Sequence, residues 1–201
     1  MKQDLILTTK RAITIFEEMI SCRRDYCADD EFFKMTDVWQ YLCNGSSEWK
    51  IKFFHQLPGQ PLRPKAAVTE FDHNVRLTVE SGVWSSASNG DKLSNFVLAH
   101  EAGHVQLRHN SRTAVRHFMM VASDKGNSVI PQDYFELEAN FAAVAFQCGV
   151  ALLDPAISAS ELARRAFSDV AQVKKVQAMV RTEVFMRELN RPKPTYPRVV
   201  L

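Results

Sequence analysis

The sequence predicts an α+β fold, in which a small antiparallel sheet lies over one central helix and further helices flank them. Residues 66–71 and 75–80 are rich in β-branched side chains, and the second segment alternates apolar and polar residues, as a strand with one solvent-facing side does. Much of the remaining chain carries apolar residues at the spacing of amphipathic helices. A chain of 201 residues, 46% of them hydrophobic, is long enough for one such domain with an extension.

We expect three parts along the chain: a helical extension over residues 1–60, the main domain over residues 61–190 and a proline-rich tail over residues 191–201. In the extension, Thr9 can cap a first helix with an apolar stripe that includes Phe16 and Ile20. Residues 32–43 are expected to form one or two short helices. Residues 53–64 are rich in proline and are expected to be irregular.

The central helix follows a polar loop at residues 85–91 and carries the motif His-Glu-Ala-Gly-His at residues 100–104. The two histidines are about one helical turn apart, so both imidazoles project from one face, which continues an apolar stripe. Two neutral imidazoles so placed can bind one Zn²⁺. Glu101, about 100° round the helix from His100, can reach a water on that metal and act as the general base of amide hydrolysis. Gly103 costs a helix about 1 kcal/mol relative to Ala, which predicts that another element packs closely there.

A catalytic zinc needs a third protein ligand, and residues 134–143 offer the best candidates. This stretch is rich in alanine and apolar, which predicts a buried helix. Its Glu136 and Glu138 point about 200° apart and cannot share one site. We predict Glu136 as the ligand, because Asn140 lies one turn further along the same face and can support a ligand imidazole. Glu138 and Asp133 are the alternative ligands, although we expect Glu138 to be solvated or salt-bridged.

Two further polar residues near these helices have open roles. His109 could polarise the scissile carbonyl, lie on the surface or support a ligand histidine. Tyr134 could donate a hydrogen bond to the oxyanion, or it could simply pack in the core or at its rim.

The C-terminal part reads as helices followed by a non-helical tail. Ser158 and Glu161 fit a capping box, and Ser168 can cap a second helix that runs to about Leu189. Residues 162–179 resemble either a DNA-reading helix-turn-helix, with Lys174, Lys175 and Arg181 on phosphates, or a helical hairpin that covers the core. We favour the hairpin and therefore expect no direct binding of nucleic acid.

The segment F-V-L-A-H-E-A-G-H at residues 96–104, followed by E-L-E-A-N-F-A-A at residues 136–143, resembles the ImmA/IrrE family of metallopeptidases. The resemblance covers roughly residues 65–185, and residues 1–60 show none. It implies a zincin-like core, with Zn²⁺ on His100, His104 and Glu136 and with Glu101 as general base. It also implies a site-specific cut in a protein partner, a helix-turn-helix repressor, in a stress response. The rival hypothesis is a metal-holding regulatory or toxin-like module that binds a repressor without cutting it. Glu101 argues against that rival, since a non-catalytic site has no need of this carboxylate.

Composition narrows the cellular setting. No uninterrupted apolar run approaches about 18 residues and the first residues lack a signal-peptide layout, so we expect neither a membrane span nor export. Four scattered cysteines without C-x-x-C pairing indicate a reducing compartment, and we expect the cytoplasm. A net charge of +2 is too small to argue for nucleic acid.

Overall fold

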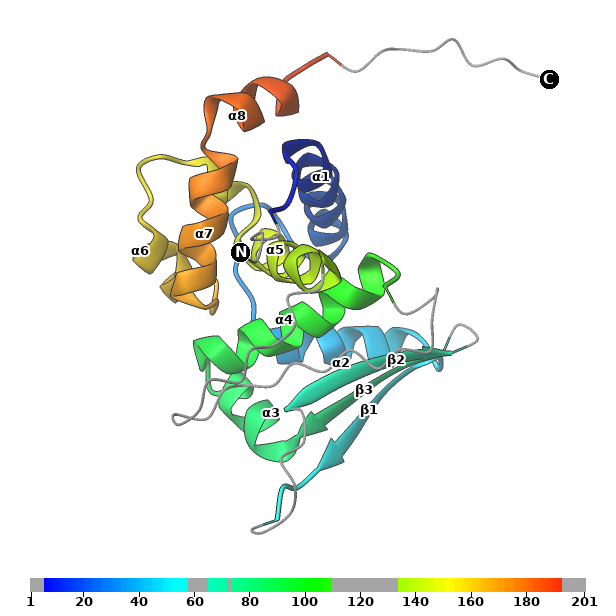
Figure 1. Ribbon diagram of the computed structural model, residues 1–201. Helices are drawn as coiled ribbons and strands as arrows, with labels where there is room; N and C mark the ends of the chain where they lie inside the picture. The colour runs from blue at the N-terminus through cyan, green and yellow to red at the C-terminus, as the bar shows by residue number, and fades with distance from the viewer. Residues whose placement is uncertain (1–5, 58–64, 72–73, 110–133, 193–201) are drawn as a thin grey trace, which may run out of the picture.

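The computed structural model of the protein describes residues 6–57, 65–71, 74–109 and 134–192. The fold class is α+β, as predicted (Figure 1). Helix α4 (Lys92–Gln106) runs between the sheet and a group of helices that includes α1 (Thr9–Tyr26) and α5 (Tyr134–Cys148). Because α4 contacts β2 of the sheet on one side and α5 on the other, it lies at the centre of the fold.

The sheet is mixed, which corrects the antiparallel sheet that the sequence predicts. β2 (Ala66–Phe71) and β3 (Asn74–Glu80) pair antiparallel, but β1 (Trp49–Phe54) joins the other edge of β3 in parallel, so the strand order is β1-β3-β2 among the described residues. β1 ends at the end of the sheet where β2 begins. The polypeptide therefore runs back along β2, and after the β2–β3 hairpin it runs along β3 in the same direction as β1. β2 is therefore an edge strand, and β3 is the centre.

One face of the sheet is buried against the helices. Val68 lies opposite Leu77, and Ala66 opposite Val79, and all four side chains are buried. Helix α4 packs beneath β2, whereas α2 (Met35–Gly45) contacts both β1 and α4. The alternation that the sequence shows in β3 therefore reflects a sheet with one covered side.

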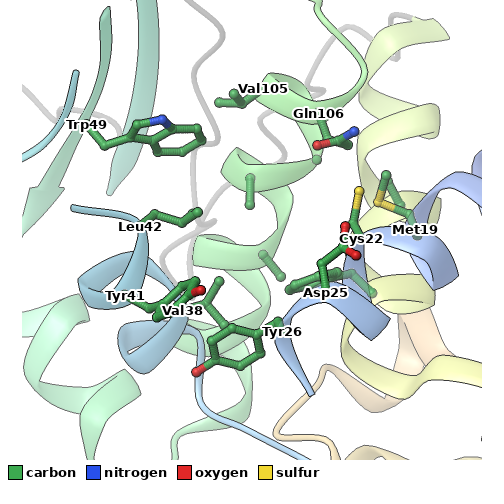
Figure 2. A pocket seen from close by; sticks show the side chains of 15 residues that line it. Met19, Cys22, Asp25, Tyr26, Val38, Tyr41, Leu42, Trp49, Val105 and Gln106 are labelled. Carbon is green, nitrogen blue, oxygen red and sulfur yellow. The ribbon is translucent and has the colours of Figure 1, made fainter. Parts of the chain in front are cut away.

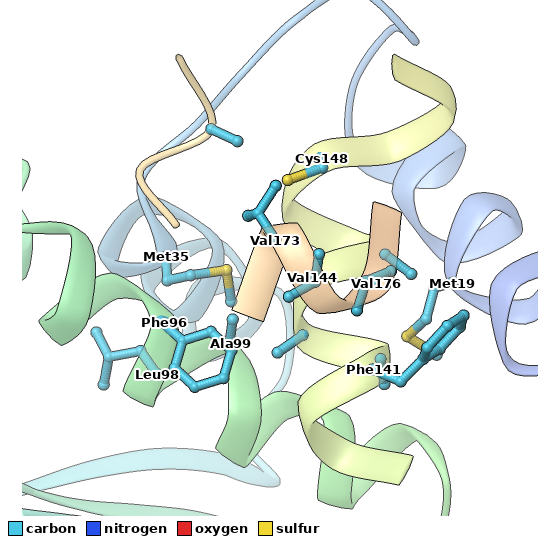
Figure 3. Close-up of a cluster of buried hydrophobic side chains, with 14 of the residues drawn as sticks. Met19, Met35, Phe96, Leu98, Ala99, Phe141, Val144, Cys148, Val173 and Val176 are labelled. Atoms are coloured by element: carbon cyan, nitrogen blue, oxygen red, sulfur yellow. The ribbon is translucent and has the colours of Figure 1, made fainter. Parts of the chain in front are cut away.

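Helix α5 is the centre of the main hydrophobic core. It contacts α1, α4 and α7 (Val170–Val180), and Figure 3 shows apolar side chains from all four helices, among them Met19, Phe96, Val144 and Val173, in one cluster. Among the described residues, Tyr134–Leu153 is long and apolar enough to cross a membrane, and 61% of its most apolar window is buried. This degree of burial matches a core helix.

Close packing between α4 and α5 accounts for Gly103. A Cβ atom at this position would lie 3.1 Å from the Ala139 carbonyl oxygen and 3.2 Å from the Ala142 Cβ. The expectation that an element packs closely against this turn is confirmed. The glycine brings the backbones of α4 and α5 together at the level of His104.

Polar contacts fix where α4 begins. The Asp91 carboxylate caps the helix by accepting from the Ser94 N–H at 2.8 Å. Asn95 is fully buried, donates to the carbonyls of Ala87 and Asp91, and accepts from the Met35 N–H at 2.8 Å. These bonds tie α4 to α2 and to α3 (Ser81–Ser88). α3 corrects the loop predicted at residues 85–91, since its serine-rich sequence still packs Val83, Trp84 and Ala87 against the core.

A buried guanidinium binds the C-terminal end of α5. Arg23 of α1 is fully buried and donates from Nη1 to the carbonyls of Phe146 and Gln147, and from Nη2 to the carbonyl of Glu31. A cation at a helix C-terminus satisfies its last carbonyls and its dipole. Gly149 follows with φ +61°, and a Cβ there would lie 2.6 Å from Arg23 Nε. α5 thus ends where Arg23 sits and where only glycine leaves room.

The C-terminal helices correct one prediction and bear out another. Ser158 caps α6 (Ala159–Arg165) as expected, by accepting from the Glu161 N–H. The single helix predicted from Ser168 to Leu189 is instead two helices, α7 and α8 (Glu183–Leu189), because Asp169 and Thr182 provide separate N-caps.

The hairpin of α6 and α7 covers the core, as the favoured interpretation of this segment predicts. Val173 and Val176 of α7 are buried against α5 and the 3-10 helix η1 (Gly149–Leu153). Arg181 donates to the carbonyls of Leu152, Asp154 and Ile157, so its guanidinium is committed to the fold. Residues 193–201, most of the predicted tail, lie outside the described part.

Candidate metal centre

Three predicted ligand side chains converge between α4 and α5. His100 Nε2 lies 3.1 Å from Glu136 Oε2, His104 Nε2 lies 3.4 Å from Glu136 Oε1, and the two Nε2 atoms are 2.9 Å apart. Both histidines are buried, and Glu136 is partly exposed. The ligand atoms of this group all lie within 4.8 Å of one another, so the group could hold a metal ion. Asp133, the third candidate for the carboxylate ligand, lies outside the described residues.

Asn140 supports His100 as the sequence predicts. Its side-chain oxygen lies 2.9 Å from His100 Nδ1. An amide oxygen only accepts, so Nδ1 carries the hydrogen of this bond. His100 Nε2 is then the nitrogen that faces Glu136 and the centre of the group.

His104 has a different support, which the sequence left open. His104 Nδ1 lies 2.9 Å from His109 Nδ1, and His109 Nε2 lies 3.1 Å from Glu138 Oε2. Glu138 in turn accepts from Arg11 of α1 at 2.7 and 2.5 Å. His109 is buried, so the surface alternative is wrong, and Glu138 is salt-bridged, as expected, and does not belong to the group of three.

Glu101 is fully buried beside the edge strand. Its Oε2 accepts from the Val68 N–H of β2 at 2.8 Å, while its Oε1 is buried and has no hydrogen-bond partner among the described residues. Burial raises the pKa of this carboxyl to about 7, against the opposing effects of His100 and of the Val68 N–H. A buried acceptor without a partner is costly, so a native fold keeps one only for a reason, such as strain, a bound water or ion, or catalysis.

The charges of the three converging residues favour a cation at their centre. Burial opposes ionisation of Glu136, but the neighbouring imidazoles of His100 and His104 hold its pKa well below the usual range. Burial also opposes protonation of His100, yet the bond to Glu136 raises its pKa overall. The two Nε2 atoms lie 2.9 Å apart and both face the ionised carboxylate, so one cation at their centre would be attracted to all three groups.

Tyr134 borders a surface hollow together with Arg11, His109 and Glu138. The structure therefore places it beside the support of His104.

A cavity of about 310 Å³ lies against the face of α4 that does not carry His100 and His104. Helices α1, α2, α4 and α5 and strand β1 line it, with Trp49, Leu42 and Tyr26 among the side chains that Figure 2 labels. Its α4 residues include Ala99, Ala102 and Gly103 but neither of the histidines nor Glu101. The cavity is therefore separate from the candidate metal centre.

Comparisons with protein-family models, with curated proteins and with solved structures find no match for this chain. The resemblance to the ImmA/IrrE family and the zincin-like core thus stay predictions, and the function has to be argued from the site itself.

Proposed function

We propose that this protein is a zinc-dependent endopeptidase that makes a site-specific cut in a protein partner. The observation that carries the proposal is the convergence of His100, His104 and Glu136 next to the buried Glu101 Oε1, which has no partner in the described part of the chain. Two imidazoles and one carboxylate are a ligand set of catalytic zinc sites, which use three protein ligands and keep a fourth position open. Structural zinc sites instead close the shell with four ligands, mostly cysteine.

Glu101 has the properties of a general base. Bound Zn²⁺ would act as a Lewis acid that polarises the scissile carbonyl and acidifies a water. The Glu101 carboxylate would take a proton from that water and later give it to the nitrogen of the leaving amine. A carboxyl with a pKa of about 7 can perform both transfers near neutral pH. The bond to Val68 would hold Glu101 in one orientation while its second oxygen accepts the proton.

The edge strand β2 offers a place for the substrate main chain. The Lys65 carbonyl accepts from the Glu80 N–H, so Lys65 faces β3, and by the alternation of a strand Val68 and Glu70 face away from it. The Val68 N–H, which donates to Glu101, lies on this outward side. An extended peptide that pairs with the outward groups of β2 would therefore pass directly beside Glu101.

The partner class follows from the resemblance alone. A helix-turn-helix repressor would present an extended segment to β2, with its folded part docked elsewhere on the protein. Main-chain pairing gives little sequence selectivity by itself, so side-chain pockets and docking would choose the partner. We expect poor cutting of an unstructured general substrate such as casein.

The test is to incubate the zinc-loaded protein with the repressor encoded by the neighbouring gene and to look for one defined pair of fragments by mass spectrometry. Glu101→Gln is the matched control, because it retains the three ligands and removes only the proton acceptor. Cutting by the wild type alone would support the proposal. Stable binding of the repressor without fragments would favour the non-cleaving module, and rapid digestion of casein would indicate a general degradative enzyme.

A further inference from the structure

We propose that Arg11, Glu138 and His109 form a chain of hydrogen bonds that selects the tautomer of His104, and that α1 is thereby part of the metal centre. The inference rests on the proposed function only in that His104 is taken as a metal ligand. His109 and Glu138 are positioning residues, since neither belongs to the group of three ligands.

The direction of each hydrogen bond follows from Arg11, the residue at the surface end of the series. The Arg11 guanidinium only donates, and it holds both oxygens of Glu138, at 2.7 and 2.5 Å. A carboxyl group that accepts from the Arg11 guanidinium at both oxygens is a carboxylate, which only accepts. The hydrogen of the 3.1 Å contact between Glu138 and His109 therefore belongs to His109 Nε2.

The same reasoning carries through both imidazoles. If each imidazole carries one hydrogen, a His109 that donates from Nε2 has no hydrogen on Nδ1, so Nδ1 can only accept. The 2.9 Å contact between the two Nδ1 atoms then requires the hydrogen to be on His104 Nδ1. A neutral His104 with its hydrogen on Nδ1 offers a lone pair at Nε2, the nitrogen that faces Glu136. The chain therefore prepares the atom that a metal needs.

The chain has the burial that such a function requires. The side chains of His109 and Glu138 are 2% and 4% exposed, whereas that of Arg11 is 35% exposed. The bonds from His104 to His109 and from His109 to Glu138 are thus shielded from water, which strengthens them. The Arg11 guanidinium forms the surface end of this series of hydrogen bonds. Asn140 performs the matching function for His100 with a single bond, so each ligand histidine has its own support.

The bond between Arg11 and Glu138 spans 127 positions of the sequence. Because α1 belongs to the N-terminal extension, removal of that extension would remove the surface end of the chain. The role of residues 1–60 in this structure therefore includes holding His104.

The first experiment uses the wild-type protein and reads the tautomer directly. Nitrogen NMR of the metal-free, ¹⁵N-histidine-labelled protein distinguishes a protonated from a bare ring nitrogen. We expect His104 and His109 to carry their hydrogens on Nδ1 and Nε2, respectively. The opposite tautomer at His104 would overturn the proposal, and misfolding of a variant cannot affect this measurement.

The second experiment measures zinc affinity by competition with a chelator. His109→Leu should bind zinc about 10–100-fold more weakly, the usual effect of removing an outer partner of a ligand. His109→Gln should restore most of the affinity, because its amide oxygen can accept from His104 while its amide nitrogen donates to Glu138. Arg11→Met should weaken zinc binding less than His109→Leu does. Arg24→Met is the matched control, since it breaks an exposed ion pair of the same helix, with Asp29.

The outcomes separate this inference from the proposed function. Wild-type zinc affinity in His109→Leu, or equal losses in the Leu and Gln variants, would overturn the chain. Weakened zinc binding in His109→Leu, restored in His109→Gln, would support it whether or not the protein cuts a repressor. Cutting of the repressor, with wild-type zinc affinity in both His109 variants, would support the proposed protease and contradict the chain of hydrogen bonds.

Discussion

Replacing Glu101 by glutamine should stabilise the metal-free protein at neutral pH, although the same change should abolish cutting. The reason is the raised pKa of Glu101, which burial moves from 4.5 to about 7. Each pKa unit corresponds to about 1.4 kcal/mol, so the shift corresponds to about 3 kcal/mol of folding free energy. The folded protein favours the protonated carboxyl, and glutamine is neutral at every pH.

The sign of the effect sets its pH window. Between pH 4.5 and about 7, the folded protein retains a proton on Glu101 that the unfolded chain has released. The stability that this proton confers is complete below the unfolded pKa and is lost as the pH rises through the folded pKa. The free energy of unfolding of Glu101→Gln minus that of the wild type should therefore rise by about 3 kcal/mol across this window and stay flat on either side.

The assay is urea unfolding in the presence of a chelator at several pH values, with the midpoint and slope recorded for both proteins. Any fixed cost of the buried amide shifts the whole curve and leaves its pH dependence unchanged. Glu48→Gln is the control, because it makes the same chemical change at an exposed side chain. A constant difference for Glu101→Gln, or one that falls as the pH rises, would refute the reasoning.

Four other substitutions have expected outcomes. Glu136→Gln should lose stoichiometric zinc in elemental analysis, whereas Glu138→Gln, which weakens the support of His104 but keeps all three ligands, should retain it; an emptied site in the second variant together with a filled site in the first would mean that the wrong carboxylate has been assigned. Gly103→Ala should destabilise the protein by about 1–3 kcal/mol in urea unfolding, since its Cβ would press on α5 at 3.1 Å, and a gain in stability would contradict this packing. Gly149→Ala should cost at least about 1–2 kcal/mol, because φ is +61° and the new Cβ would displace Arg23; an unchanged unfolding midpoint would disprove that account.

The sequence predicted those parts of the site that depend on positions within one helix. His100, Glu101 and His104 lie within about one turn, and Glu136 and Asn140 are likewise one turn apart, so helical geometry alone places each set on one face. Gly103 gave a correct signal of close packing because a glycine inside a helix carries a known cost. The sequence also predicted that the two helices bring His100, His104 and Glu136 together, and the structure has these three side chains in one group.

The parts that the sequence did not predict depend on contacts between distant segments. Nothing in the local pattern of α1 pairs Arg11 with Glu138, since the packing of α1 on α5 decides it. β1 was missed for another reason. Trp49, Ile51 and Phe53 alternate with lysines, as in a strand, but the prolines that follow predict an irregular segment, and the end of β1 was assigned to it. The helix α3 was missed because serine favours loops locally, whereas its three apolar residues pack against the core.

The way the metal centre is assembled has a consequence for quality control in the cell. Its ligands and their supports come from α1, α4, α5 and the turn that follows α4, so none of these helices can detach without taking a ligand or its support away. For an enzyme of the proposed kind, partial unfolding that detaches any one of them would then also weaken the binding of the metal. A damaged copy would become inactive instead of turning into an unrestrained protease, and loss of zinc would be an early sign that the copy is ready for degradation.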